Sequence, residues 1–145
     1  MRPKFLLLAF LLGLFSATAL AENSSPWETY IINPEHSEIR FTVPYMGISS
    51  VSGRFEEFKG SFQRHKQSGK VKNIQVEVRA ESLDTSDAQR DQHLRSADFF
   101  HVKEFPWILL NEGEIFSAPK KRFNLLKGQL TLRGNTRPFV LKTQT

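Results

Sequence analysis

Residues 74–81 of the sequence are Ile74-Gln75-Val76-Glu77-Val78-Arg79-Ala80-Glu81, in which apolar and polar side chains alternate without a break. Successive side chains of a β-strand point to opposite faces of the sheet, so this pattern predicts a strand with one buried face and one solvated face. Antiparallel sheets commonly bury one face only, whereas strands of parallel sheets are apolar on both faces. This segment therefore favours an antiparallel β-protein.

Further strand-like segments flank this one on both sides. Residues 38–43 alternate in the same way, and Pro44 predicts an edge position or the end of pairing. We expect one long strand from Val51 to Phe62, with a bulge near Glu56 and Glu57 because the apolar phase changes there. The remaining expected strands are 27–32, 105–110, 113–117, 123–133 and 139–143. We expect turns at 46–50, 64–69 and 134–138.

A single segment favours a helix. Residues 84–87 offer several N-cap side chains, and residues 88–95 are polar with good helix formers. Seven or eight short strands with one small helix indicate an all-β antiparallel barrel or sandwich. The glycines Gly53, Gly60 and Gly128 inside strands favour a strongly coiled barrel, and they slightly favour an interior cavity because a missing side chain leaves room.

The first 21 residues have the three parts of a secretory signal peptide. Arg2 and Lys4 precede an apolar run over residues 5–15, and small residues follow up to Ala21. Cleavage after Ala21 leaves 124 of the 145 residues, with 18 basic and 15 acidic side chains. We therefore expect a periplasmic protein. Its small net charge argues against nucleic acid as a partner, and the absence of cysteine excludes a disulfide scaffold and a cysteine nucleophile.

The densest cluster of polar side chains lies within residues 90–100. We interpret Arg90, Asp91, His93 and Asp98 as the hydrogen-bonded side chains of a loop that closes one end of the barrel. A remote alternative is a hydrolase in which Asp91 or Asp98 assists His93 as general base, although no nucleophile is evident. The spacing of the four histidines does not indicate a metal site, so we expect none.

Three segments resemble the YceI-like family, which is described as periplasmic, polyisoprenoid-binding and lipocalin-like. The first segment is His36-Ser37-Glu38-Ile39-Arg40-Phe41-Thr42-Val43, together with the glycines and Phe residues that follow it up to residue 60. The second is Arg90-Asp91-Gln92-His93-Leu94-Arg95-Ser96-Ala97-Asp98-Phe99-Phe100, followed by Phe105-Pro106. The third is Gly128-Gln129-Leu130-Thr131-Leu132-Arg133-Gly134, followed by Thr136-Arg137-Pro138. The resemblance implies an antiparallel barrel that is not an enzyme. It implies an apolar lumen that binds a long isoprenoid, such as a quinone tail or a polyprenol, with no cofactor.

The candidate lumen residues come from the inward phases of the expected strands and from the loop. They are Ile39, Phe41, Val43, Tyr45, Val51, Phe55, Val76, Val78, Phe99 and Phe100. From periodicity alone the strand positions among them favour a packed core over a cavity lining, although a small barrel can have either. Tyr45 stands near the place where the family usually has histidine, and Phe99 and Phe100 either contact ligand or plug the barrel end.

The resemblance also implies that the domain over residues 22–145 lacks its C-terminal part, because the family's domain continues with closing strands. An incomplete barrel would expose an edge strand and apolar lumen. The explanations are a fragment, pairing with a second copy as a homodimer, or a member that no longer binds lipid. The alternative function is thus a non-enzymatic interaction or stress-related module that binds no lipid. The triplet Lys120-Lys121-Arg122 favours a solvated turn, with transient contact with anionic membrane lipids as an alternative.

Overall fold

The structure, a computed structural model, describes residues 25–45, 49–117 and 123–143. The expected signal peptide, the tip of the expected turn at 46–48 and the basic triplet at 120–122 lie outside these ranges, as does the side chain of Tyr45. Among the described residues, none belongs to a helix long and apolar enough to cross a membrane.

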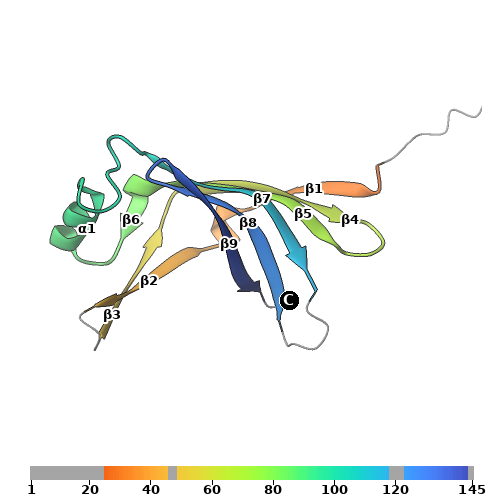
Figure 1. Cartoon of the computed structure of the whole chain (residues 1–145), viewed down its shortest axis with the longest axis horizontal. Helices are drawn as coiled ribbons and strands as arrows, with labels where there is room; N and C mark the ends of the chain where they lie inside the picture. Colours follow the sequence, from red (N-terminus) through yellow and green to blue (C-terminus); the bar gives the residue numbers. More distant parts are fainter. Residues whose placement is uncertain (1–24, 46–48, 118–122, 144–145) are drawn as a thin grey trace, which may run out of the picture.

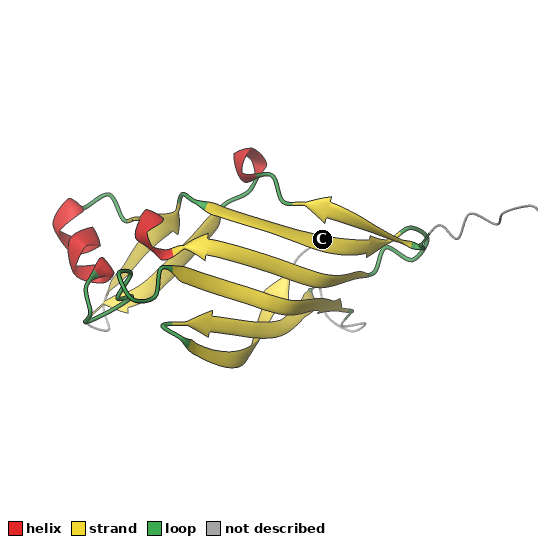
Figure 2. Cartoon of the chain, turned by 90° about the horizontal axis from the view of Figure 1, so that it is seen from above, coloured by secondary structure: helices red, strands yellow, loops and turns green. Residues whose placement is uncertain are grey.

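Two antiparallel sheets and one short α-helix make up the fold, as Figure 1 shows. The larger sheet has the order β1 (Trp27–Ile31), β4 (Phe58–His65), β5 (Val71–Arg79), β7 (Trp107–Phe116), β8 (Asn124–Leu132) and β9 (Asn135–Thr143). The smaller sheet has the order β2 (Ile39–Tyr45), β3 (Ser49–Phe55) and β6 (Leu83–Asp84). The helix α1 (Ala88–Arg95) lies at one end of the molecule, and two 3-10 turns occupy Pro34–His36 and Ala80–Ser82 (Figure 2). The helix has the predicted bounds.

The strand β5 shows the alternation from which the fold class was predicted. Ile74 and Val78 on its inner face are 9% and 6% exposed, whereas Gln75, Glu77 and Arg79 are exposed on its outer face. Strand β5 pairs antiparallel with β4 on one side and with β7 on the other. A central position in the sheet, with one covered face, accounts for the clean period of two.

The prediction of a single strand from Val51 to Phe62 is wrong. Strand β3 ends at Phe55 and β4 begins at Phe58, and the two strands belong to different sheets. The exposed residues Glu56 and Glu57 form the corner, where their amides donate to the carbonyl and hydroxyl oxygens of Ser82 at 3.1 and 3.0 Å. The change of apolar phase marks a chain that passes from one sheet to the other, not a bulge.

The prediction of two strands between residues 105 and 117 is also wrong, because β7 is one strand with an irregularity. Its pairing with β8 shifts between Asn111 and Glu114, where two residues of β7 face one of β8. Within this bulge Glu112 has a φ of 55°. A bulge of this kind bends and twists the strand, and it accounts for the phase change that suggested a break.

The hairpin of β8 and β9 turns earlier than predicted. Leu132 pairs with Asn135, so only Arg133 and Gly134 form the turn, both with positive φ as in a type I′ turn. Residues 135–138 therefore belong to β9 and not to the turn. Pro138 is tolerated within a strand because β9 has a neighbour on one side only among the described residues. Pro44 likewise lies in β2, the predicted edge strand of the smaller sheet.

The apolar core lies where the two sheets meet. Phe55 of β3, Val78 of β5 and Leu83 of β6 are at most 6% exposed and contact one another. Among the described residues no strand pairing joins the two sheets, so they do not form a closed barrel. The predicted class, an antiparallel β-protein with one short helix and an incomplete barrel, is confirmed.

Candidate ligand-binding cavity

A cavity of about 610 Å³ lies between the smaller sheet, the helix end of the molecule and the β8–β9 turn. Its lining combines apolar side chains with a few polar ones. The lining residues are Phe41, Val43, Pro44 and Val51 of β2 and β3, Arg90, His93 and Leu94 of α1, Asp98, Phe99 and Phe100 of the loop after it, and Leu132 with Arg133 at the hairpin turn. Its volume falls within the range of about 300–1,000 Å³ that is typical of small-molecule sites.

The pairing of β2 with β3 sets the sheet side of the cavity. Val43 pairs with Val51, and Phe41 pairs with Gly53, so the apolar side chains of both strands share one face. The Phe41 ring lies 5.2 Å from the ring of Phe55 and 6.3 Å from that of Phe100. These aromatic contacts connect the cavity wall to the core beneath it.

The glycines within the strands do not leave room for a ligand, contrary to the expectation. A β-carbon on Gly53 would lie 2.5 Å from Cζ of Phe41 and 2.8 Å from Cγ2 of Thr85. A β-carbon on Gly128 would lie 2.8 Å from the carbonyl oxygen of Asn111. The space beside each glycine is thus filled by a neighbouring ring or by backbone. The cavity results from the divergence of the two sheets and not from missing side chains.

Helix α1 is placed at the cavity by a capping side chain and by a carboxylate. Asp87 is the N-cap, and its carboxylate accepts from the amide of Arg90 at 3.0 Å. This hydrogen bond, together with the charge of Arg90, holds the pKa of Asp87 below its usual value. Asp91 is 6% exposed and accepts from the amide and the hydroxyl of Thr85 at 3.0 and 2.6 Å.

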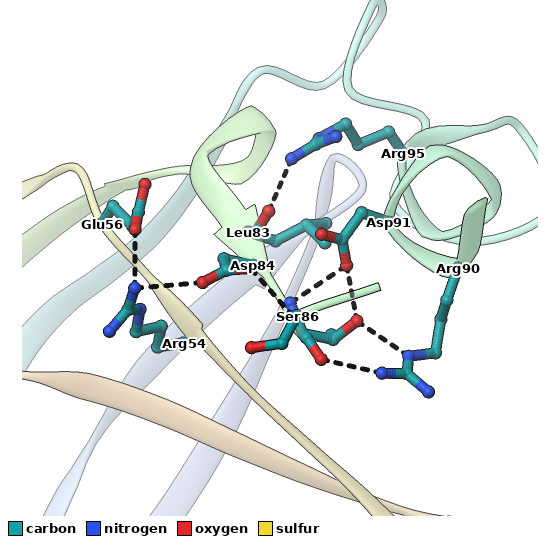
Figure 3. A network of polar contacts seen from close by, with 9 residues as sticks. Arg54, Glu56, Leu83, Asp84, Ser86, Arg90, Asp91 and Arg95 are labelled. Carbon is teal, nitrogen blue, oxygen red and sulfur yellow. Dashed lines mark hydrogen bonds and ion pairs between the residues drawn. The ribbon is translucent and has the colours of Figure 1, made fainter. Parts of the chain in front are cut away.

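Two arginines of the helix bind backbone carbonyls and attach it to the smaller sheet, as Figure 3 shows. Arg90 donates to the hydroxyl and carbonyl oxygens of Thr85, both at 2.7 Å. Arg95 donates to the carbonyl oxygens of Glu81 and Leu83 at 2.8 and 2.6 Å. Arg90 and Asp91, which were expected to have a structural role, thus hydrogen-bond to Thr85, and Arg90 also lines the cavity.

His93 and Asp98 form an exposed pair at the cavity, with 3.3 Å between Nε2 and the carboxylate. The remote hydrolase hypothesis requires a nucleophile beside this pair. The nearest hydroxyl in sequence, that of Ser96, donates instead to the carbonyl oxygen of His93. Asp91 lies two positions from His93, on another face of the helix, and is engaged by Thr85. The described contacts therefore give this hypothesis no support.

The predicted lumen residues divide into two groups. Phe41, Val43, Val51, Phe99 and Phe100 line the cavity. The others with described side chains pack in or against the core instead, and these are Ile39, Phe55, Val76 and Val78. The alternation of apolar residues indicates which face of a strand points inward, but it does not indicate whether other side chains pack against that face or leave a cavity there.

The cavity residues that sequence reasoning missed are Pro44, Leu94, Leu132 and Arg133. Leu94 is the one apolar residue among the last six of α1, and it packs against the core. An isolated leucine on a polar helix indicates a contact with the protein interior, so this residue could have been found from the sequence. The hairpin turn carried no such signal, because its approach to the cavity depends on the twist of the larger sheet.

Within residues 25–45, 49–117 and 123–143, no three acidic or histidine side chains are grouped so that they could hold a metal ion.

The comparisons with known proteins agree with this architecture. The family profile described as "YceI-like domain" matches residues 30–145. A UPF0312 protein of Photorhabdus laumondii is 33% identical over 137 residues, covering 92% of this chain and 70% of the relative. A UPF0312 protein of Vibrio cholerae is 32% identical over 117 residues, covering 79% of this chain and 61% of the relative.

Two solved structures are similar in fold. The YceI protein of Campylobacter jejuni has a TM-score of 0.60 at 25% identity, with 78% of this chain and 66% of that chain covered. BcnA of Burkholderia cenocepacia has a TM-score of 0.68 at 17% identity, with 78% and 70% covered. The fold is thus of the lipocalin-like kind. The chain spans between 61% and 70% of the length of these four proteins.

Proposed function

The chain belongs to the YceI-like family, and from this premise we propose that it is a periplasmic carrier that binds the apolar chain of an isoprenoid-type lipid. A quinone tail or a polyprenol has the required chemistry. The YceI-like fold is a binding-protein fold, and its members are generally periplasmic. The bound lipid would be a ligand and not a cofactor.

The cavity between the two sheets is the observation that carries this proposal. Its walls include the side chains of Phe41, Val43, Val51, Leu94 and Phe100, which offer an apolar surface of the kind that a hydrocarbon chain prefers. The polar residues among the lining, Arg90, His93, Asp98 and Arg133, could bind the polar end of an amphiphile.

A second hollow extends the apolar path along the β8–β9 hairpin. It has about 380 Å³, is lined in part by Leu130 and Phe139, and shares Leu132 and Arg133 with the cavity. A long isoprenoid exceeds one small-molecule site, so a continuation of this kind supports a chain-like ligand over a compact one.

The direct test is chemical. The processed protein, purified from a lipid-replete periplasm without detergent, is extracted with organic solvent, and the extract is analysed by mass spectrometry. We expect an isoprenoid in stoichiometric amount. A protein that is folded but contains no lipid contradicts the proposal.

A cavity-filling substitution localises the ligand. Val51 is half-buried on the cavity wall, so Val51→Phe should occupy part of the cavity and reduce the bound lipid severalfold. Val140→Phe is the matched control, because Val140 is 59% exposed on β9 and does not line the cavity. Equal lipid content in both variants would place the ligand elsewhere.

A second candidate is a non-enzymatic interaction module, the alternative expected from the sequence. The exposed strand β9 favours it, because Val140 and Leu141 are 59% and 52% exposed at the edge of the sheet. Such an edge can pair with a strand of a second copy or of another protein. Light scattering distinguishes the candidates: a strictly monomeric protein with bound lipid excludes the module, whereas a lipid-free dimer favours it.

A further inference from the structure

The rim of the cavity exposes three large apolar side chains from three separate elements. Val43 of β2, Phe99 of the loop after α1 and Leu132 of β8 are 48%, 45% and 39% exposed, and all three line the same cavity. Single exposed apolar residues are ordinary, but a group around one opening indicates a surface that contacts an apolar partner.

The exposure of Phe99 follows from the structure of its loop. The amides of Phe99 and Phe100 donate to the carbonyl oxygens of Ser96 and Leu94 at 3.2 and 3.0 Å, which fixes the backbone. Phe100 then packs edge-on against Phe55 at 5.9 Å. Phe99 turns the other way and contacts the ring of His93 at 4.9 Å. The loop thus packs one phenylalanine against the core and presents its neighbour at the rim.

The charged side chains beside the rim are mostly basic. Arg90 and Arg133 line the cavity, and Arg137 lines the adjoining hollow together with Arg133. The acidic residue of the cavity lining, Asp98, is paired with His93. Beyond Glu114 every charged side chain of the sequence is Lys or Arg. In the described part of the chain, neither Arg133 nor Arg137 takes part in an ion pair.

We propose that the rim formed by Val43, Phe99, Leu132 and Arg133 docks on the surface of an anionic phospholipid bilayer. The apolar side chains enter the boundary between headgroups and acyl chains, and Arg133 attracts the anionic headgroups. A lipid that moves between the bilayer and a cavity opening onto it never exposes its whole tail to water. The inference rests on the proposed lipid-binding function, and it places membrane contact at the cavity opening and not at the triplet of residues 120–122.

Vesicle flotation tests the docking. The processed protein is mixed with vesicles of phosphatidylcholine alone, or of phosphatidylglycerol and phosphatidylcholine in equal amounts. We expect it to float with the anionic vesicles and to dissociate as salt is raised. Arg133→Glu should weaken this binding by more than about fivefold, the typical effect of one basic residue at such a surface. Leu132→Asp should weaken it at least as much.

Matched controls lie on the same hairpin, away from the rim. Lys127→Glu is the control for Arg133→Glu, because both replace a basic side chain by an acidic one. Val140→Asp is the control for Leu132→Asp, because both replace an apolar side chain by an acidic one. Lys127 and Val140 pair with each other across β8 and β9 and line neither the cavity nor the adjoining hollow. The controls should retain most of the vesicle binding, and thermal unfolding verifies that all four variants fold.

Several outcomes overturn the inference. Equal losses in the rim variants and their controls would show diffuse charge attraction in place of a docking site. A wild-type dimer that Leu132→Asp dissociates would make the rim a subunit interface.

A wild-type protein that contains lipid but does not float refutes docking and leaves the proposed function intact. A protein that floats but contains no lipid refutes the proposed function and not the docking.

Discussion

Asp91 is a carboxylate almost without contact with water, and the bonds described for it come from the amide and the hydroxyl of Thr85. The same hydroxyl accepts from Arg90 at 2.7 Å, so a single hydroxyl connects the anion to the cation. Charge-assisted hydrogen bonds of this kind are stronger than neutral ones. The contact fixes the first turns of α1 against the smaller sheet, and thereby fixes one wall of the cavity.

Asp91→Ala should lower the free energy of unfolding by about 1–3 kcal/mol, since it leaves the buried amide and hydroxyl of Thr85 without their acceptor. Urea unfolding measures the change. Asp98→Ala is the control and should alter stability by less than about 0.5 kcal/mol, because the Asp98 side chain is 75% exposed. Equal effects would contradict the structural role of Asp91.

Gly53 is a second residue at which a single added methyl group should have a measurable effect on stability. Gly53→Ala places a methyl group against the Phe41 ring, which Phe55 and Phe100 hold in place, and should cost about 1–3 kcal/mol. In the double variant with Phe41→Leu the shorter side chain leaves space for the methyl group. The double variant should therefore be more stable than the sum of the single effects predicts, and a double-mutant cycle measures this difference. Strict additivity would contradict the close contact.

At the level of elements, α1 is a helix that depends on its attachments. It has eight residues, of which Asp91 is the buried one, and it has little apolar surface for the core. A helix of this length is marginal in water without tertiary contacts. Its cap at Asp87 and the carbonyls bound by Arg90 and Arg95 replace the usual apolar stripe.

Asp87→Ala should lower the melting temperature at neutral pH and have less effect in acid. The pKa of Asp87 is lowered in the folded state, so its stabilisation is complete above the ordinary carboxylate pKa. It is lost as the pH falls through the lowered value. Asp87→Asn keeps a capping oxygen without a titrating group, so it should be destabilised less than Asp87→Ala, and the difference in stability between these two variants should not vary with pH over this range. Thermal unfolding as a function of pH provides the measurement, and a pH-independent effect of Asp87→Ala would contradict the capping role.

At the scale of the whole molecule, two sheets, each with one apolar face, meet at a small core. Phe55, Val78 and Leu83 are its centre, while Val43, Leu132 and Leu141 on diverging parts of the sheets stay exposed. A molecule with apolar surface open to solvent gains stability when a ligand covers that surface. The proposed lipid would therefore act as part of the core.

Removal of the bound lipid should lower the melting temperature, and reloading with the extracted lipid should restore it. A ligand present at 100 times its Kd stabilises a folded protein by about 2.7 kcal/mol. Val51→Phe, which fills part of the cavity, should show a smaller difference between its loaded and delipidated forms. Calorimetry of both forms gives the measurement, and identical curves for the wild-type protein would refute a structural contribution of the lipid.

The sequence by itself determined most of the strand segments, the bounds of the helix and the alternation of β5. The period of two in β5 and the capped polar segment at α1 are local patterns, and local sterics and solvation govern them. The same alternation led to the expectation that Phe41, Val43 and Val51 share one face, and these residues line the cavity. Two of the failed predictions concern places where the same local pattern has two possible physical causes. A change of phase accompanies a sheet change at Glu56 and Glu57, and it accompanies a bulge at Glu112.

Only the tertiary structure decided which inward positions are core and which line the cavity. Phe55 and Phe41 lie on the same face of the smaller sheet, yet Phe55 is covered by Val78 and Leu83, whereas Phe41 borders the cavity. Leu132 and Arg133 reach that cavity from a hairpin turn that lies nearly forty residues after the end of α1 in the sequence. Burial depends on what packs above a residue, and the twist and divergence of two whole sheets determine that packing.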